Sequence, residues 1–235
     1  MNRVKLLLAS TSTIYGGTYL DYLEESIQKH FEASKNIVFI PFARPGGISH
    51  EGYSAIACRK FNSLGLKIQG LDGSKEAIKT LKKADGVFVG GGNSFVLLKA
   101  LYDLNLIETL KSKILDGMPY MGSSAGSNLA GLTIGTSNDM PIVYPPSFDA
   151  LGAIHFNINP HYFDPMEGSK HMGETRETRI KEFHHYNEQA VLGLREGSWL
   201  QVSEGRILLK GDFKARLFRK EMEAIELPAG DLIRI

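Results

Sequence analysis

Short apolar segments alternate with amphipathic segments through the first two thirds of the chain, and this pattern constrains the fold more than any other feature. The run 4–9, which is apolar apart from Lys5, and the apolar runs 37–42 and 86–89 each have the length of one buried strand. Between them, apolar residues recur at spacings of three and four, which is typical of a helix with one buried face. Apolar strands separated by such helices are typical of a parallel sheet covered on both sides, so we expect a doubly wound α/β fold with a mostly parallel sheet.

The remaining elements follow the same reasoning. Further strands are predicted over 66–71, 118–122, 154–158 and 190–194, and helices over 53–64, 75–84, 95–115, 125–132 and 176–185, with a break near 103–105. The last third differs, because glycine-containing turns separate four short strands over 199–202, 206–210, 215–218 and 225–227. We expect them to form an antiparallel C-terminal ribbon that closes one edge of the sheet. No repeat or linker divides the chain, so a single domain over residues 1–235 is expected.

Composition and charge exclude several classes of function. The chain has 27 Lys and Arg against 26 Asp and Glu, and this balance argues against nucleic acid or an anionic membrane as a partner. The single cysteine, Cys58, excludes an intrachain disulfide and a multi-cysteine metal site. No apolar run approaches the about 18 residues of a spanning helix, and the run 4–9 is too short for a signal peptide. We therefore expect a cytoplasmic protein.

The clearest chemical motif is Gly-Ser-Ser-Ala-Gly at residues 122–126, which matches the G-x-S-x-G nucleophile elbow. A predicted strand precedes it and a predicted helix follows it, as an elbow requires. Glycines at both flanks permit a tight turn that exposes Ser124, and the N-terminus of a helix favours a developing oxyanion. The plain alternative is a turn that only caps the helix.

A second strand end carries Gly-Gly-Gly-Asn at residues 90–93. These glycines could cradle a phosphate, but the last glycine of G-x-G-x-x-G is missing and no Walker lysine is present. They could instead form half of an oxyanion hole with Asn93 near the substrate. They could also only turn the chain before a helix that Asn93 caps. The residues leave these three interpretations open.

A serine nucleophile needs a nearby base, because a free hydroxyl is a weak nucleophile. His161 follows the predicted strand over 154–158, at the edge where parallel sheets bind ligands, and is the candidate base. His155 is expected to pack inside that strand. His30, His184 and His185 are expected to be solvated on charged helix faces.

The base in turn needs a carboxylate that fixes its tautomer. Asp139 and Glu196 both follow suitable elements, and spacing does not choose between them. Arg176 and Arg179 share one helix face, where they either pair with neighbouring glutamates or clamp a substrate carboxylate. A metal hydrolase is a competing interpretation, but no H-E-x-x-H or H-x-H pattern exists, so no metal site is expected.

Together these segments resemble the bacterial aspartyl dipeptidases, the dipeptidase E family of serine peptidases, along nearly the whole chain. The resemblance is carried by residues 38–43, 90–95, 122–130, 138–143, 148–151, 158–161, 173–177 and 196–199. It implies a flavodoxin-like, three-layer fold of the class-I-glutamine-amidotransferase kind. It also implies hydrolysis of Asp-X dipeptides. We expect no cofactor, a monomer or homodimer, and no nucleic acid or membrane partner.

By position, the resemblance assigns the nucleophile to Ser124 and the base to His161. It assigns the third member of the triad either to Asp139, the usual choice, or to Glu196. A related hydrolase of another aspartyl bond, such as a cyanophycin-degrading enzyme, would share this elbow. A non-catalytic nucleotide or phosphate binder would use residues 90–93 instead.

The resemblance also assigns the substrate contacts. The oxyanion donors fall on the backbone N–H groups of Gly92 and Ala125, and recognition of the aspartate side chain falls on Arg176 or a neighbour. One departure is visible, because the family often has Trp before the nucleophile and this chain has Ser123. We expect this change to alter the pocket wall beside Ser124.

Overall fold

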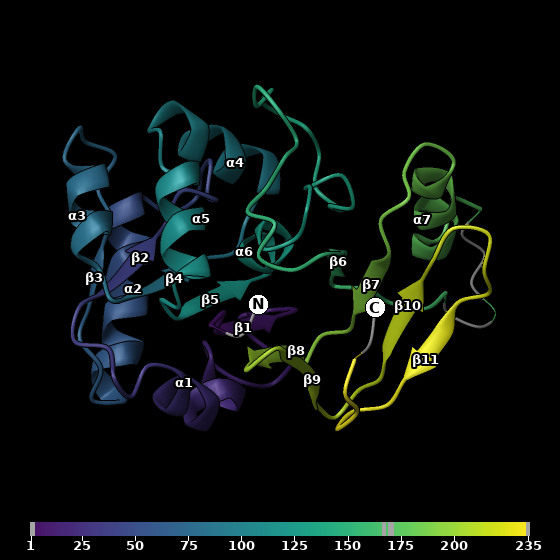
Figure 1. Ribbon diagram of the computed structural model, residues 1–235, viewed down its shortest axis with the longest axis horizontal. Coiled ribbons are helices and arrows are strands. Elements are labelled where there is room, and N and C mark those ends of the chain that lie inside the picture. The colour runs from purple at the N-terminus through teal and green to yellow at the C-terminus, as the bar shows by residue number, and fades with distance from the viewer. Residues whose placement is uncertain (1–2, 166–167, 169–171, 234–235) are drawn as a thin grey trace.

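The computed structural model describes residues 3–165, 168 and 172–233, and two sheets organise them (Figure 1). The larger sheet has seven strands in the order β3-β2-β4-β5-β1-β8-β9. Its parallel strands are β1 (Leu6–Ala9), β2 (Ile37–Ile40), β3 (Ile68–Gly70), β4 (Gly86–Val89) and β5 (Tyr120–Ser123). Strands β8 (Ser198–Ser203) and β9 (Arg206–Gly211) continue it as an antiparallel hairpin. The mostly parallel sheet predicted from the sequence is confirmed.

Helices cover both faces of this sheet, as a doubly wound fold requires. Leu6 and Leu8 of β1 face a core cluster completed by α3 (Ala77–Lys83), α4 (Ser94–Asp103), α5 (Ile107–Leu115) and α6 (Ala125–Leu129). Leu7 and Ala9 face the opposite cluster, completed by the short 3-10 helix η1 (Asp21–Leu23), α1 (Glu24–His30) and α2 (His50–Ser63). Because side chains alternate across a strand, β1 buries both faces, which explains why its sequence is apolar throughout.

The helix predicted over 95–115 is two helices, and the predicted break is confirmed. Helix α4 ends at Asp103, and Asn105 adopts a φ of 55° before α5 begins at Ile107. Asparagine tolerates this left-handed conformation better than most residues. No helix in the described ranges is long and apolar enough to cross a membrane.

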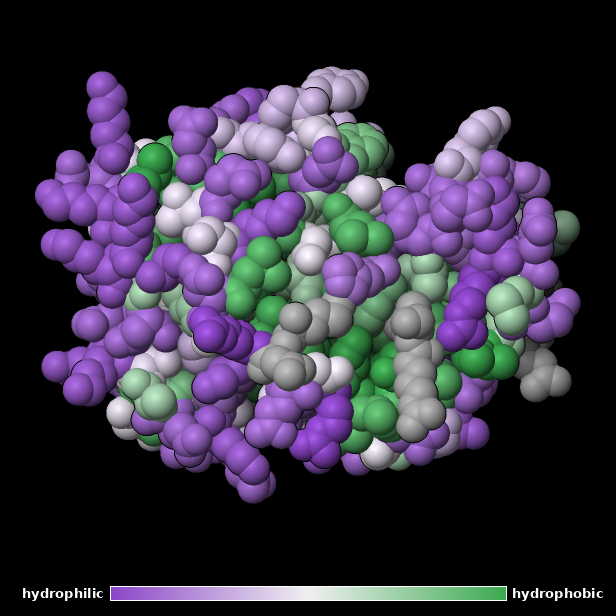
Figure 2. All heavy atoms as spheres, viewed as in Figure 1, coloured by the Kyte–Doolittle hydropathy of each residue, from purple (hydrophilic) through white to green (hydrophobic). Residues whose placement is uncertain are grey.

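The second sheet has four strands in the order β11-β10-β7-β6. They are β6 (Asn157–Pro160), β7 (Val191–Leu194), β10 (Ala215–Phe218) and β11 (Ile225–Leu227), and α7 (Arg176–His184) packs against them. Figure 1 shows this sheet and α7 beside the β8–β9 edge of the first sheet. Hydrophilic residues cover most of the face in Figure 2, and apolar residues are visible mainly around its middle.

The C-terminal strands differ from the sequence prediction. Only β8 and β9 close an edge of the large sheet, whereas β10 pairs with β7 and β11 pairs with β10 in the second sheet. A short strand pattern gives the faces of a strand but not its partner, because pairing depends on residues distant in sequence. His161 directly follows β6, which also belongs to this second sheet.

Candidate active site

Ser124 lies on a strained turn between β5 and α6, the context that the elbow motif requires. Its φ is 53° and its ψ is −111°, a sparsely populated conformation that costs about 1–3 kcal/mol. A Cβ atom at Gly122 would lie 2.4 Å from the carbonyl oxygen of Gly126, and one at Gly126 would lie 2.3 Å from that of Val89. The flanking glycines are therefore required, because backbone occupies the space of their side chains.

His161 comes within hydrogen-bond distance of Ser124, although 37 residues separate them and their strands belong to different sheets. The Nε2 atom of His161 lies 2.8 Å from Ser124 Oγ. Like Ser124, His161 has a positive φ, 53°. Ser124 and His161 each directly follow a strand and each adopt an unusual backbone conformation. This brings the predicted nucleophile and base together.

Of the two candidate carboxylates, the structure brings Glu196 to the histidine. Glu196 Oε1 lies 2.5 Å from His161 Nδ1. The Oδ2 atom of Asp139 instead accepts hydrogen bonds from the Ser94 N–H at 2.7 Å and from Ser137 Oγ at 2.8 Å. Spacing left both carboxylates open, and Asp139, the usual choice that the resemblance implies, does not contact His161 in this geometry.

Strand pairing explains why Glu196 reaches His161. Strands β6 and β7 run parallel, and Pro160 lies opposite Leu194 at their ends. His161 directly follows the first of these ends and Glu196 follows the second by two residues. Because parallel strands leave a sheet at the same edge, the two side chains meet there.

Ser10, which belongs to none of the sequence motifs, fixes the backbone of His161. Its fully buried Oγ accepts a hydrogen bond from the His161 N–H at 2.9 Å and donates one to the Leu194 carbonyl at 2.7 Å. Ser10 directly follows β1, so one hydroxyl joins the ends of β1, β6 and β7. A buried polar residue directly after an apolar strand is the signal that could have identified it.

Ser10→Ala should lower the free energy of unfolding by about 1–3 kcal/mol, because it leaves the partly buried N–H of His161 without its partner and removes one of the two hydrogen bonds that the Leu194 carbonyl accepts. It should also lower kcat, since His161 loses the contact that holds its positive φ. Urea unfolding and steady-state kinetics measure both effects. Ser63→Ala is the control, because its exposed Oγ donates to the Lys60 carbonyl at a helix end and has no other partner in the described part of the chain. Equal stability of the two variants would contradict the assigned role of Ser10.

The glycine loop after β4 lies directly against the serine. A Cβ atom at Gly91 would lie 3.0 Å from Ser124 Cβ. At Gly92, where φ is 147°, it would lie 2.2 Å from the Ala43 carbonyl oxygen, so only glycine fits. The Tyr53 hydroxyl accepts a hydrogen bond from the Gly91 N–H at 3.0 Å and donates to its carbonyl at 3.3 Å. Tyr53 therefore holds this loop in place.

Two backbone N–H groups near Ser124 are available to bind a ligand. Ala125 opens α6, where the first N–H groups have no acceptor within the helix. Neither Ala125 N–H nor Gly92 N–H has a hydrogen-bond partner among the described residues. Free N–H groups beside a nucleophile are the type of donor that stabilises an oxyanion.

Asn93 caps α4, as expected if residues 90–93 turn the chain before a helix. Its Oδ1 accepts from the N–H groups of Phe95 and Val96 at 3.0 and 3.1 Å, and its Nδ2 donates to the Met140 carbonyl at 2.9 Å. Both polar atoms of the side chain thus bind backbone, and the contact of Asn93 with substrate stays a prediction.

A cavity of about 490 Å³ adjoins the histidine. Its lining consists of His161, Tyr162, Phe163, Asp164, Arg176, Arg195, Glu196 and Phe213. The guanidinium of Arg195 binds the carboxylates of Asp164 and Glu226, so its charge is compensated. The other cation of the lining, Arg176, has no carboxylate partner among the described residues.

The guanidinium of Arg176 is available to bind an anion. Its guanidinium carbon lies 5.1 Å from the centre of the Phe163 ring, and its buried Nε has no hydrogen-bond partner in the described part of the chain. Burial lowers the pKa of Arg176, and the nearby charge of Arg179 lowers it further. Arg179 itself is exposed and does not line the cavity, so the predicted pair of arginines contributes one residue to it.

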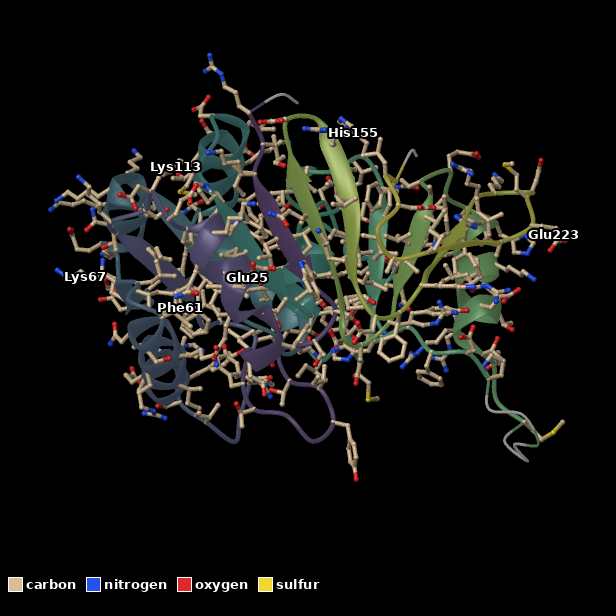
Figure 3. All side chains as sticks on the ribbon, turned by 90° about the horizontal axis from the view of Figure 1, so that it is seen from below. Glu25, Phe61, Lys67, Lys113, His155 and Glu223 are labelled. Atoms are coloured by element: carbon tan, nitrogen blue, oxygen red, sulfur yellow. The ribbon has the colours of Figure 1, made fainter. Side chains whose placement is uncertain are left out.

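Three histidines differ from their predicted environments. His155 precedes β6 and is exposed at the edge of the molecule (Figure 3), so it does not pack inside a strand. The Nε2 of His30 lies 3.1 Å from the Tyr120 carbonyl, and burial lowers its pKa to about 4. His184 is buried and lies 3.0 Å from the Gln189 carbonyl. Apolar faces of α1 and α7 carry these last two rings inward.

Ser123 does not form the pocket wall that the sequence predicts. Its side chain is fully buried at the end of β5, and its Oγ has no hydrogen-bond partner among the described residues. Successive residues of a strand point to opposite faces, so the residue before Ser124 points into the core. The departure from the family pattern at this position therefore affects packing in the core beneath the turn at Ser124.

No group of three or more His, Cys, Asp or Glu in the described ranges could hold a metal ion.

Comparison with known proteins gives a consistent set of relatives. The family described as Peptidase family S51 matches residues 6–210. Peptidase E of Streptomyces coelicolor is 45% identical over 227 residues, which cover 97% of this chain and 92% of that protein. A probable alpha-aspartyl dipeptidase of Drosophila melanogaster is 42% identical over 231 residues, covering 97% of this chain and 95% of that protein.

Two solved structures share the fold. A peptidase from an acI-B1 Actinobacterium matches with a TM-score of 0.74 at 18% identity, covering 100% of this chain and 99% of that one. A putative Peptidase E from Listeria monocytogenes EGD-e matches with a TM-score of 0.66 at 23% identity, covering 88% and 98%.

Proposed function

The chain belongs to peptidase family S51, and on that premise we propose that it hydrolyses dipeptides with an amino-terminal aspartate through an acyl-enzyme on Ser124. It is a peptidase of the serine type. One observation carries the proposal. A continuous hydrogen-bonded series runs from Ser124 Oγ through His161 to Glu196, beside a cavity lined by Arg176, which has no carboxylate partner among the described residues.

Acylation follows from this arrangement. His161 Nε2 accepts the proton of Ser124 Oγ while Oγ attacks the carbonyl carbon of the substrate. The Glu196 carboxylate accepts the hydrogen bond of Nδ1–H, so it fixes the tautomer and stabilises the imidazolium that forms. The N–H groups of Gly92 and Ala125 bind the negative oxygen, an interaction that is complete only in the transition state.

Acylation ends when the tetrahedral intermediate collapses, its C–N bond breaks, and His161 gives its proton to the leaving amine. Deacylation then repeats these steps with water. A water molecule then enters, His161 takes one of its protons, and the resulting hydroxide attacks the ester. Collapse of the second intermediate returns the proton to Ser124 and releases aspartate, and no cofactor takes part.

Arg176 supports the preference for aspartate. A guanidinium forms two parallel hydrogen bonds with a carboxylate, which supplies both charge and geometry. A dipeptide with asparagine or alanine at its amino terminus would leave the half-buried guanidinium of Arg176 without a partner. The free-energy cost of that unpaired charge is larger than the loss of the contact alone. The cavity that Arg176 lines also contains His161, so one substrate residue can reach both side chains.

Arg176→Ala should lower the ratio of kcat/KM for Asp-Leu over Asn-Leu by about 100-fold, because a desolvated charge pair is lost for one substrate only. Measuring both substrates with the same enzyme preparation cancels errors in concentration. Arg179→Ala is the matched control, since Arg179 is exposed and outside the cavity. An unchanged ratio in Arg176→Ala would remove this residue from substrate recognition.

A hydrolase of another aspartyl bond would use the same serine. The substrate panel therefore includes a β-aspartyl-arginine dipeptide, the unit of cyanophycin, beside the α-linked Asp-X dipeptides. Faster hydrolysis of the β-linked peptide would replace the proposed substrate class and leave the role of Ser124 intact.

A further inference from the structure

A second, much smaller cavity lies against Ser124. Its volume is about 20 Å³, and its lining consists of Ser94, Ser124, Ala125, Ser137, Asn138, Asp139, Pro160 and His161. A space of this size holds about one water-sized group. An ammonium group has this size and carries three donors.

Asp139 contributes the charge in this small cavity. Its Oδ2 is held by the Ser94 N–H and by Ser137 Oγ, which fixes the orientation of the carboxylate. Its Oδ1 has no hydrogen-bond partner among the described residues, and the side chain is half-buried. A fixed carboxylate with one free oxygen beside two hydroxyl groups is a site for a cation and repels an anion.

The triad leaves Asp139 without a catalytic task, because Glu196 already occupies Nδ1 of His161. The proposed substrate, however, carries a second charged group. The α-ammonium nitrogen of an amino-terminal residue is two bonds, or about 2.5 Å, from the carbonyl carbon that Ser124 attacks. When that carbon contacts Ser124, the ammonium must therefore lie in a space that Ser124 itself lines.

We propose that Asp139 binds the α-ammonium group of the substrate, with Oδ1 accepting one of its hydrogen bonds, and so restricts the enzyme to peptides with a free amino terminus. This inference rests on the proposed function and names a second specificity-determining residue for the same site. The acyl residue is then held at both charges, its side-chain carboxylate by Arg176 and its ammonium by Asp139. Asp139 and Arg176 are near enough for their charges to interact.

The test compares Asp-Leu with succinyl-Leu, which differs only by hydrogen in place of the ammonium group. The wild type should prefer Asp-Leu by about 100-fold or more in kcat/KM, because a charge pair that bound substrate shields from water is worth this factor. Asp139→Asn should lower kcat/KM for Asp-Leu far more than for succinyl-Leu, so the preference shrinks to below about tenfold. Glu196→Gln should lower kcat/KM for both substrates by the same factor, so the preference for Asp-Leu over succinyl-Leu should stay unchanged.

Asp116→Asn is the control for a change of Asp to Asn, because Asp116 is exposed at the end of α5 and distant in the fold from the elbow. Equal losses on both substrates in Asp139→Asn would overturn the inference. A wild type that cleaves succinyl-Leu as fast as Asp-Leu would overturn it without any variant, so the result does not depend on how well Asp139→Asn folds. If the wild type fails to cleave Asp-Leu, the proposed function fails, and this inference fails with it.

Discussion

Ser124→Ala lowers kcat for Asp-Leu by about 10⁴-fold or more, because loss of a triad nucleophile removes the covalent route and leaves only binding and the oxyanion donors. The fold should persist, since alanine keeps the Cβ atom and the strained φ of 53° is a property of the turn rather than of the hydroxyl. Steady-state kinetics gives the loss of activity, and thermal unfolding followed by circular dichroism tests the fold.

The neighbouring serine provides a matched control for this variant. Ser123→Ala removes a buried hydroxyl that has no hydrogen-bond partner among the described residues, so stability should be unchanged or higher. Its kcat should stay within about threefold of the wild type, as for most changes that touch no reacting group. A Ser124→Ala enzyme that keeps more than about one hundredth of wild-type activity would contradict the assignment of the nucleophile.

Glu196→Gln lowers kcat by about 10³–10⁴-fold for every substrate, the second largest effect that we expect. An amide can present its NH₂ group to Nδ1 of His161, which favours the wrong tautomer and removes the charge that stabilises the imidazolium. The 2.5 Å contact between Glu196 and His161 makes this residue the direct partner of the base. Initial rates with Asp-Leu at saturating concentration measure the effect on kcat.

Asp139→Asn is the comparison that separates the two carboxylates. Its effect should depend on the amino group of the substrate, whereas the effect of Glu196→Gln should not. If Glu196→Gln kept wild-type kcat while Asp139→Asn lost activity on all substrates, Asp139 would be the third member of the triad and the observed contact with Glu196 would be incidental.

The fold and the elbow could be predicted because their signals are local. Apolar strands alternate with amphipathic helices at recognisable spacings, and Gly122 and Gly126 lie between a strand and a helix as the motif requires. The position of His161 was also predictable, because it follows a strand directly. Each of these inferences needed only residues close together in the sequence.

The partner of the histidine could not be predicted, because it depends on the pairing of β6 with β7. About 30 residues separate the two strands in sequence, and a strand pattern does not identify its neighbour. The same limit explains why Ser10 and Tyr53 were missed. Each positions a catalytic segment through backbone groups that are distant in sequence, and the sequence does not show which distant groups a polar side chain will bind.

Surface arginines show a third limit of the sequence. Arg176 and Arg179 share a helix face, yet only Arg176 lines the cavity, because the side-chain direction relative to a neighbouring loop is set by tertiary packing. Periodicity therefore gives the helix and its face, whereas the burial of Arg176 depends on tertiary contacts such as the one with the Phe163 ring.

Covalent labelling with a serine-directed phosphonate tests the central claim most directly. An activated serine in hydrogen-bond contact with a histidine reacts with such a reagent, whereas an ordinary serine does not. Intact-mass measurement should show one phosphonyl group per chain, and peptide mapping should place it on Ser124, with no labelling of Ser124→Ala. Absence of labelling in the active wild type, or modification of a different residue, would contradict the account.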